Sequence, residues 1–131
     1  MKKIFTILMV LFVGACAYQH RPVYTVDDPT PRWVADLPLS RVEDLIVSAA
    51  SPRGWKCQHV AEGHLVATQS QEKFSATVDI YFDRQHWRIA YQSSVGLGAE
   101  NGEIHAHYNF WVRNLEHDIN QRFAAVLGAS S

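Results

Sequence analysis

Phe74-Ser75-Ala76-Thr77-Val78-Asp79-Ile80-Tyr81-Phe82 is the stretch of this 131-residue chain that decides its fold. Apolar and polar residues alternate along it, which is the pattern of a β-strand with one buried and one wet face. Three further short segments show strand patterns, at residues 55–60, 64–69 and 87–93. Because turn residues separate the four segments, they predict an antiparallel meander with one face open to water.

Segments with helical periodicity precede and follow the four strand segments in the sequence. Ser40-Arg41-Val42-Glu43 matches a capping box, and the apolar stripe behind it predicts a helix that ends at Ser51-Pro52-Arg53-Gly54. Apolar residues recur every three or four positions over residues 104–126, which predicts a long C-terminal helix. The order helix, four strands, helix predicts a two-layer α+β domain with both helices on the apolar sheet face, an arrangement that looks like a helix grip.

The N-terminal residues have the composition of a secretory signal. Lys2-Lys3 precede an uncharged run over residues 4–13, which is shorter than the roughly 20 apolar residues of a membrane-spanning helix. Val13-Gly14-Ala15-Cys16 ends this run and resembles the lipobox of bacterial lipoproteins, which implies cleavage before Cys16 and acylation of that residue. In that class, Ala17 after the cysteine implies the outer membrane, with the domain facing the periplasm. The alternative is an ordinary signal peptide that contains a cysteine.

The chain is accordingly divided into three predicted parts. Residues 1–15 are a signal peptide, residues 16–39 are a lipid-anchored tether, and residues 40–131 are the α+β domain. The tether is predicted because it contains four prolines and few consecutive apolar positions, although Trp33-Val34-Ala35 could form a short edge strand. Such a segment would hold the domain a few tens of ångströms from the membrane.

Charge and cysteine content narrow the functional classes. Cleavage removes Lys2-Lys3 from the 12 basic residues and leaves 10 against 13 acidic ones, a net charge of about −3. This balance predicts no nucleic-acid partner. Acylation of Cys16 leaves Cys57 as a single cysteine that cannot form an internal disulfide. Since Cys57 shares a strand face with Trp55, we expect it in the core.

Three motifs carry a resemblance to a known family. Arg53-Gly54-Trp55, Tyr91-Gln92-Ser93 and the helical segment Ile-His-Ala-His-Tyr-Asn-Phe-Trp over residues 104–111 resemble a family of small, functionally uncharacterised proteobacterial lipoproteins. The likeness covers roughly residues 40–123. Gln92 stands where the family pattern often has an aspartate, so the resemblance does not mark the following loop as a shared site. Because the family has no known activity, the resemblance implies a fold and a compartment only.

The seven histidines are the first place to look for chemistry. On a helix, His105 and His107 would point about 200° apart, which argues against a shared metal ion. His59 and His64 flank the first hairpin, but no cysteine or carboxylate cluster completes a set of four ligands. We therefore expect no metal and no other cofactor.

A catalytic set could be drawn from Ser93 as nucleophile, His105 as base and Asp79 as orienting acid. The chain has no Gly-x-Ser-x-Gly elbow and no recognisable oxyanion loop, and a small meander offers little cleft to exclude water. The glycine-rich residues 96–102 lack the Gly-Lys-Ser/Thr ending of a phosphate-binding loop and are expected to form a mobile loop. No enzymatic activity is therefore predicted.

Two functional classes remain. The preferred one is a lipoprotein bound to the membrane through acyl chains on Cys16, with an envelope protein as partner. The alternative is a small-ligand or peptidoglycan-related binder or hydrolase that uses residues 93–109. Its candidate binding residues are Ser93, His105, Tyr108, Asn109 and Trp111. The other explanation, which we prefer, is structural: the aromatic members pack on the sheet, and Asn109 ties the glycine loop to the start of the helix through Tyr91 or Ser93. Exposed parts of four other side chains are candidates for a recognition surface: Trp33, Tyr81, His86 and Trp87.

Overall fold

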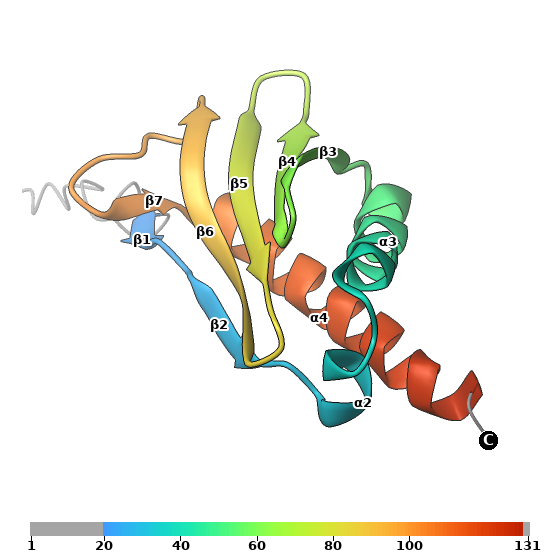
Figure 1. Ribbon diagram of the computed structural model, residues 1–131. Helices are drawn as coiled ribbons and strands as arrows, with labels where there is room; N and C mark the ends of the chain where they lie inside the picture. The colour runs from blue at the N-terminus through green and yellow to red at the C-terminus, as the bar shows by residue number, and fades with distance from the viewer. Residues whose placement is uncertain (1–19, 130–131) are drawn as a thin grey trace, which may run out of the picture.

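The computed structural model describes residues 20–129, and the fold is α+β (Figure 1). The predicted signal peptide and Cys16 lie outside the described residues. The chain enters through β1 (His20–Pro22), β2 (Val26–Pro29), α2 (Arg32–Ala35) and α3 (Leu39–Ala50). After a short 3-10 turn come β3 (Lys56–Ala61), β4 (His64–Ser70), β5 (Ser75–Phe82) and β6 (His86–Val95). The last elements are β7 (Glu103–His105) and the long helix α4 (Ala106–Ala129).

The main sheet is antiparallel and has the strand order β2-β6-β5-β4-β3, while β1 and β7 form a separate two-stranded sheet. The four predicted strands are therefore neighbours in meander order, but the prediction of a four-stranded sheet is wrong by one strand. The fifth strand is β2, which places Val26 opposite Ile89 and Asp28 opposite Trp87. The pairing joins residues far apart in the sequence, so no local pattern reveals it.

Residues 20–39 belong to the folded domain, and the tether predicted there is wrong. Val34 on α2 is buried, and Trp33 donates its indole N–H to a backbone carbonyl of α4 at 2.8 Å. A helix stands where the sequence predicted a short edge strand. Pro31 and Pro38 are the N-cap residues of α2 and α3, so these prolines start helices and do not space an extended linker.

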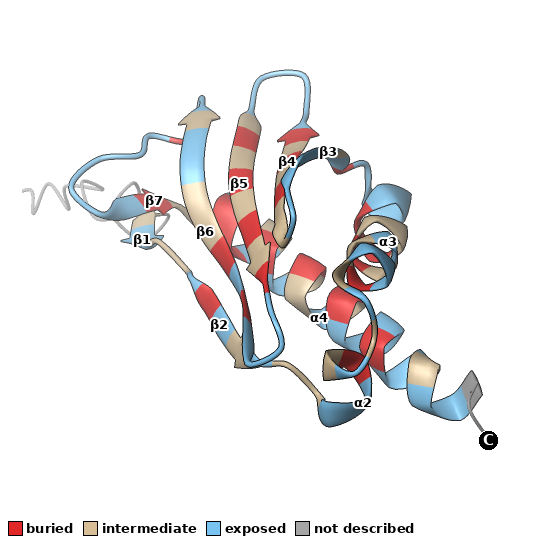
Figure 2. Cartoon of the chain, viewed as in Figure 1, coloured by how far each residue is buried: buried red, intermediate tan, exposed pale blue. Residues whose placement is uncertain are grey.

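Helices α3 and α4 cover one face of the main sheet and leave the other face bare (Figures 1 and 2). The alternation along β5 is confirmed: its four apolar residues are buried and the residues between them are half-buried on the bare face. Helix α4 buries residues at three- and four-residue spacing against the sheet, namely Tyr108, Val112, Leu115, Ile119 and Phe123. Within residues 20–129, no helix is both long enough and apolar enough to cross a membrane.

Both helices begin elsewhere than predicted. Helix α3 starts at Leu39, and the structure gives no side-chain hydrogen bond at its N-terminus, so the expected capping box at Ser40 does not form. Ile104 and His105 lie in β7 and not in the C-terminal helix. The partner strand β1 holds them extended, and His105 Nδ1 then accepts the backbone N–H of His107 at 3.1 Å, at the start of α4.

Gly63 fixes the hairpin between β3 and β4. Its φ is +76°, a value that side chains disfavour, and a Cβ there would lie 2.7 Å from the carbonyl oxygen of Phe82. The Phe82 N–H in turn bonds the Gly63 carbonyl at 3.0 Å. This close approach brings the hairpin against the end of β5.

Carboxyl groups join the edge strand β2 to helix α4. Burial, with the hydrogen bond and the charge of Glu116 as smaller causes, raises the pKa of Asp28 to about 6. Asn120 forms a further hydrogen bond with Asp28, and Tyr24 donates its hydroxyl proton to the Glu116 carboxylate. The folded state therefore holds a proton on Asp28 at a pH where the unfolded chain has released it.

Asp28→Asn is expected to stabilise the protein at neutral pH but not in acid. Between pH 3.8 and about 6 the folded chain keeps the Asp28 proton that the unfolded chain loses, so stability falls as pH rises through this window. Because asparagine cannot ionise, the free energy of unfolding of the variant at pH 7.5 should exceed that of the parent by about 1–2 kcal/mol, after allowance for solvent screening. Urea unfolding at several pH values measures the difference. A gap between variant and parent that does not change with pH would contradict the assignment.

Candidate functional site on the open sheet face

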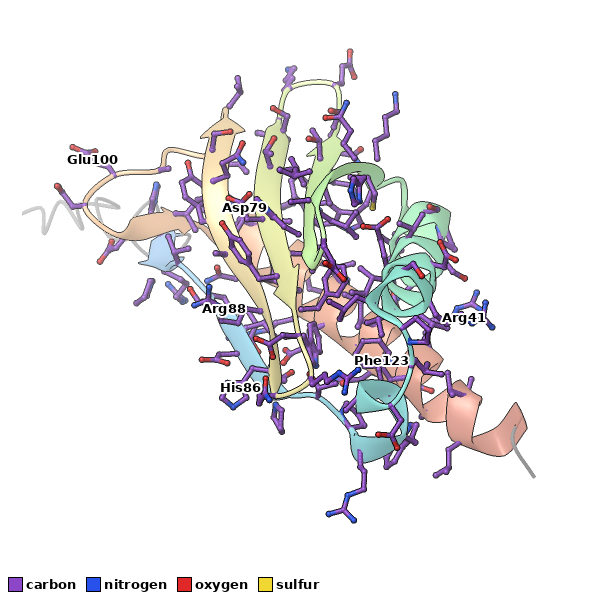
Figure 3. The ribbon with its side chains drawn as sticks, in the orientation of Figure 1. Arg41, Asp79, His86, Arg88, Glu100 and Phe123 are labelled. Carbon is purple, nitrogen blue, oxygen red and sulfur yellow. The ribbon has the colours of Figure 1, made fainter. Side chains whose placement is uncertain are left out.

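Polar and aromatic side chains form a row on the open face of the main sheet, and two of them, Asp79 and Arg88, are labelled in Figure 3. The guanidinium carbon of Arg88 lies 5.1 Å from the centre of the Tyr81 ring, and Tyr81 stacks on His64 with ring centres 4.3 Å apart. His64 Nε2 lies 2.7 Å from Asp79 Oδ1, which also accepts a hydrogen bond from Gln92 Nε2 at 3.1 Å. These five residues are called the polar row.

The strand register explains how the row forms. His64 on β4 lies opposite Tyr81 on β5, and Tyr81 lies opposite Arg88 on β6, so the three side chains project from the same face. A bulge between β5 and β6 places Ser93 opposite Thr77 and leaves Gln92 as the extra residue beside Asp79. The row therefore depends on the pairing of three strands.

The contacts within the row prepare it for binding. Each side chain is held by a neighbour, so docking of a partner costs less side-chain entropy than it would for free side chains. Tyrosine and arginine are also the residue types that contribute most to binding at protein interfaces. A bare sheet face with an ordered row of this composition is suited to a protein surface.

A groove continues from the Arg88 end of the row. A cavity of about 600 Å³ is lined by Tyr81 and Arg88 of the row together with Asp27, His86 and Glu62, among others. A second cavity of about 500 Å³ shares Glu62 and the Gly63 turn with the first. Because the groove is lined by charges of both signs, it is better suited to bind a protein surface with mixed charges than a polyanion.

The five binding residues predicted from the sequence lie in different places. Ser93 is exposed on the open face of β6, His105 ends β7, Trp111 is half-buried on α4, and Tyr108 and Asn109 are buried on the first turns of α4. A cavity of about 580 Å³ lies beside the start of α4, and Asn109 is the one member of the five that lines it. The structure does not gather these residues into one pocket there.

Asn109 forms hydrogen bonds that hold the chain around Pro22 and Tyr24 against α4. Its Oδ1 accepts the backbone N–H of Tyr24 at 2.9 Å, and its Nδ2 donates to the carbonyl oxygen of Pro22 at 2.9 Å. The two bonds join α4 to the last residue of β1 and to the connection that follows it. The residue therefore has a structural role, but its partners are Tyr24 and Pro22 and not Tyr91 or Ser93.

Tyr108 packs its ring edge-on against Tyr91, with ring centres 5.5 Å apart. Its hydroxyl is buried and has no hydrogen-bond partner among the described residues. Burial raises the pKa of this hydroxyl, so Tyr108 stays neutral. A buried hydroxyl without a partner lowers stability.

Tyr108→Phe is expected to raise the free energy of unfolding by about 1 kcal/mol, because it removes an unpaired buried hydroxyl and keeps the ring. Tyr91→Phe is the matched control, since the Tyr91 hydroxyl lies 2.9 Å from Ser94 Oγ and its loss should cost about 1 kcal/mol. Urea unfolding of both variants gives the comparison. A Tyr108→Phe variant less stable than the parent would mean that the hydroxyl has a partner, such as a buried water.

The catalytic set considered from the sequence is dispersed. Asp79 bonds His64 and Gln92 in the polar row, and Ser93 and His105 belong to different sheets. Burial, with the charges of His107 and His20 as smaller causes, lowers the pKa of His105, which favours the neutral ring that caps α4.

The expectation that His105 and His107 point apart is wrong, because His105 lies on a strand. The two ring centres are only 4.8 Å apart. Within residues 20–129, however, no group of three or more histidine, cysteine, aspartate or glutamate side chains is placed to hold a metal ion. The proximity of the two rings therefore defines no metal centre in the described part of the chain.

Tyr81 and His86, two of the four candidate recognition side chains, line the groove. A third candidate, Trp87, is instead fully buried against Phe123, with ring centres 5.7 Å apart. Of the other members of the polar row, Asp79 and His64 enter the sequence predictions only as an orienting acid and a possible metal ligand, and Arg88 and Gln92 have no predicted binding role. The polar positions of the alternating strand were the available signal, but the register that assembles them was not.

Comparison of the chain with protein-family models, with curated proteins and with solved structures finds no match. The basis for a function is therefore the sequence motifs together with the geometry of the open face. Of the surfaces described above, the polar row and its groove combine order, exposure and the residue types of an interface.

Proposed function

We propose that this chain is a non-enzymatic lipoprotein of the cell envelope. Acyl chains on Cys16 hold it at the outer membrane, and its domain faces the periplasm and binds an envelope protein through the open sheet face. The lipobox and the family resemblance support the anchor and the compartment, and a sheet with both helices on one face supports a helix-grip arrangement. The polar row is the observation that carries the binding role.

A protein partner fits this face better than a small ligand does. The row presents stacked and hydrogen-bonded side chains along three strands, and the groove beside it carries both signs of charge. An extended surface of this kind can hold many weak contacts around a few ordered ones. The alternative, a pocket built from residues 93–109, is less favoured because Tyr108 and Asn109 are buried and apart from Ser93.

Site-specific photocrosslinking in intact envelopes tests the binding role. A photoreactive residue at Ala90 or Val66 lies on the open face beside Asp79, while one at Gln121 lies exposed on α4 and serves as the control. We expect one protein adduct of the same size from both open-face positions and none from the control. Arg88→Ala should weaken the adduct several-fold without unfolding the domain. Equal adducts from all three positions, or none, would overturn the proposal.

The anchor is tested separately by mass spectrometry of the mature N-terminus. We expect Cys16 to be the first residue and to carry acyl chains, and the protein to fractionate with the outer membrane. Cys16→Ala should abolish acylation and release the protein from the membrane fraction. A mature chain that begins elsewhere and carries no lipid would contradict the anchor.

A further inference from the structure

The sheet formed by β1 and β7 lies a short chain length from Cys16. Strand β1 begins at His20, where it pairs with His105, and Asn109 holds the residues that follow β1. Four residue steps separate Cys16 from His20, and a fully extended chain covers about 14 Å in that distance. A chain anchored through Cys16 therefore has no long tether, and this end of the domain must remain near the lipid.

The same end carries an unusual share of exposed apolar side chains. Val95 is 67% exposed, Phe110 is 64% exposed and Phe74 is 38% exposed. They are three of the six large apolar residues that are exposed among residues 20–128. On a freely tumbling domain such side chains cost solvation free energy, so a cluster of them indicates a contact surface.

The three side chains lie near one edge of this end of the domain. A Cβ at Gly96, the residue after Val95, would lie 3.2 Å from Phe74 Cδ1, and the Phe74 and His107 rings have centres 6.2 Å apart. His107 and Phe110 are three residues apart on α4 and thus share a side of the helix. Phe110 and Arg21 line the same cavity. Arg21, Phe74, Val95, His107 and Phe110 are called the membrane-facing surface.

We infer that this surface rests on the lipid headgroups of the membrane that holds Cys16. The inference builds on the proposed lipid anchor, and its occupant is the lipid surface itself. Phenylalanine side chains of membrane-surface segments bury at the boundary between headgroups and acyl chains, and Arg21 adds a positive charge that anionic lipids attract. The short link between Cys16 and His20 keeps this end of the domain close to the membrane, and the exposed apolar residues contact the lipid.

This contact gives the anchored domain a fixed orientation. Helix α4 begins beside β7 and runs away from that end, so its C-terminal turns point away from the membrane (Figure 1). Exposed Leu127, near the end of α4, then lies far from the lipid. The polar row shares no residue with the membrane-facing surface, which leaves it accessible to a protein partner.

Environment-sensitive fluorescent labels test the orientation on the full acylated protein. In a Cys57→Ala background, nitrobenzoxadiazole is attached at Phe110→Cys, and the protein is reconstituted in vesicles of phosphatidylethanolamine and phosphatidylglycerol. Leu127→Cys is the matched control, since it is an exposed apolar residue of the same helix. We expect the label at position 110 to brighten at least about twofold and to be quenched by nitroxide-bearing lipids, as for a probe inside the interface. The label at position 127 should stay unchanged.

The outcomes separate the contact from the anchor. If acylated protein floats with the vesicles while both labels remain in water, the membrane-facing surface is overturned and the anchor stands. If the protein carries no acyl chain and does not float, the proposed anchor fails and the inference fails with it. A second label at Val95→Cys checks that the response is not peculiar to the variant at position 110. It should brighten and be quenched as the label at position 110 is.

Discussion

Trp87→Ala is expected to lower the free energy of unfolding by about 4 kcal/mol. The Trp87 side chain is fully buried where β6 meets α4, and it packs edge-on against Phe123. Truncation removes its buried apolar area and leaves a cavity between the sheet and the helix, which the rigid elements cannot fill. Urea unfolding followed by circular dichroism measures the loss.

Trp87→Phe provides the matched control. The indole N–H of Trp87 is buried and has no hydrogen-bond partner among the described residues, so phenylalanine loses no hydrogen bond. We expect this variant to lose about 1 kcal/mol, from reduced packing alone. If alanine and phenylalanine had equal effects, packing against α4 would not be the source of the stability.

Asn109→Ala is expected to cost about 3 kcal/mol, although asparagine contributes little apolar area. The change removes two hydrogen bonds and leaves the Tyr24 N–H and the Pro22 carbonyl without their partner. It also frees the chain between β1 and β2, so hydrogen exchange at the Tyr24 amide should accelerate more than exchange in β5. Urea unfolding and hydrogen exchange together check both effects.

Asn114→Ala is the comparison variant for Asn109. Asn114 lies on the same helix and is half-buried, but the structure gives its side chain no hydrogen bond among residues 20–129. We expect a change below about 0.5 kcal/mol and unaltered exchange at Tyr24. Similar losses of stability in the two variants would mean that helix propensity, and not the hydrogen bonds of Asn109 to Tyr24 and Pro22, causes the effect.

Local patterns predicted the centre of the fold. The alternation over residues 74–82 appears in β5 as alternating buried and half-buried residues, because period two is a property of any strand with one covered face. The apolar repeat before residue 126 appears in α4 for the equivalent reason. The prolines before residue 40 do not by themselves distinguish a tether from folded chain, since proline occurs in linkers, at strand ends and at helix starts.

The candidate site could be predicted only in part. The polar positions of β5 were visible, including Asp79 and Tyr81, but their partners His64, Arg88 and Gln92 come from two other strands and a bulge. Cross-strand contacts depend on register, which is set by the whole sheet. The residues proposed around α4 do not gather, because His105 lies on β7, which pairs with β1, and Ser93 lies on the open face of the main sheet.

Sequence by itself determined the elements whose signal is periodic along the chain, the α+β class and the motif that predicts acylation at Cys16. These properties depend on residues that are neighbours in the sequence. Tertiary structure alone decided that residues 20–39 join the domain, that β2 completes the sheet, and that the polar row assembles on its open face. Each of these results depends on pairing between distant segments, whose free energy comes from burial and hydrogen bonds that exist only in the folded chain.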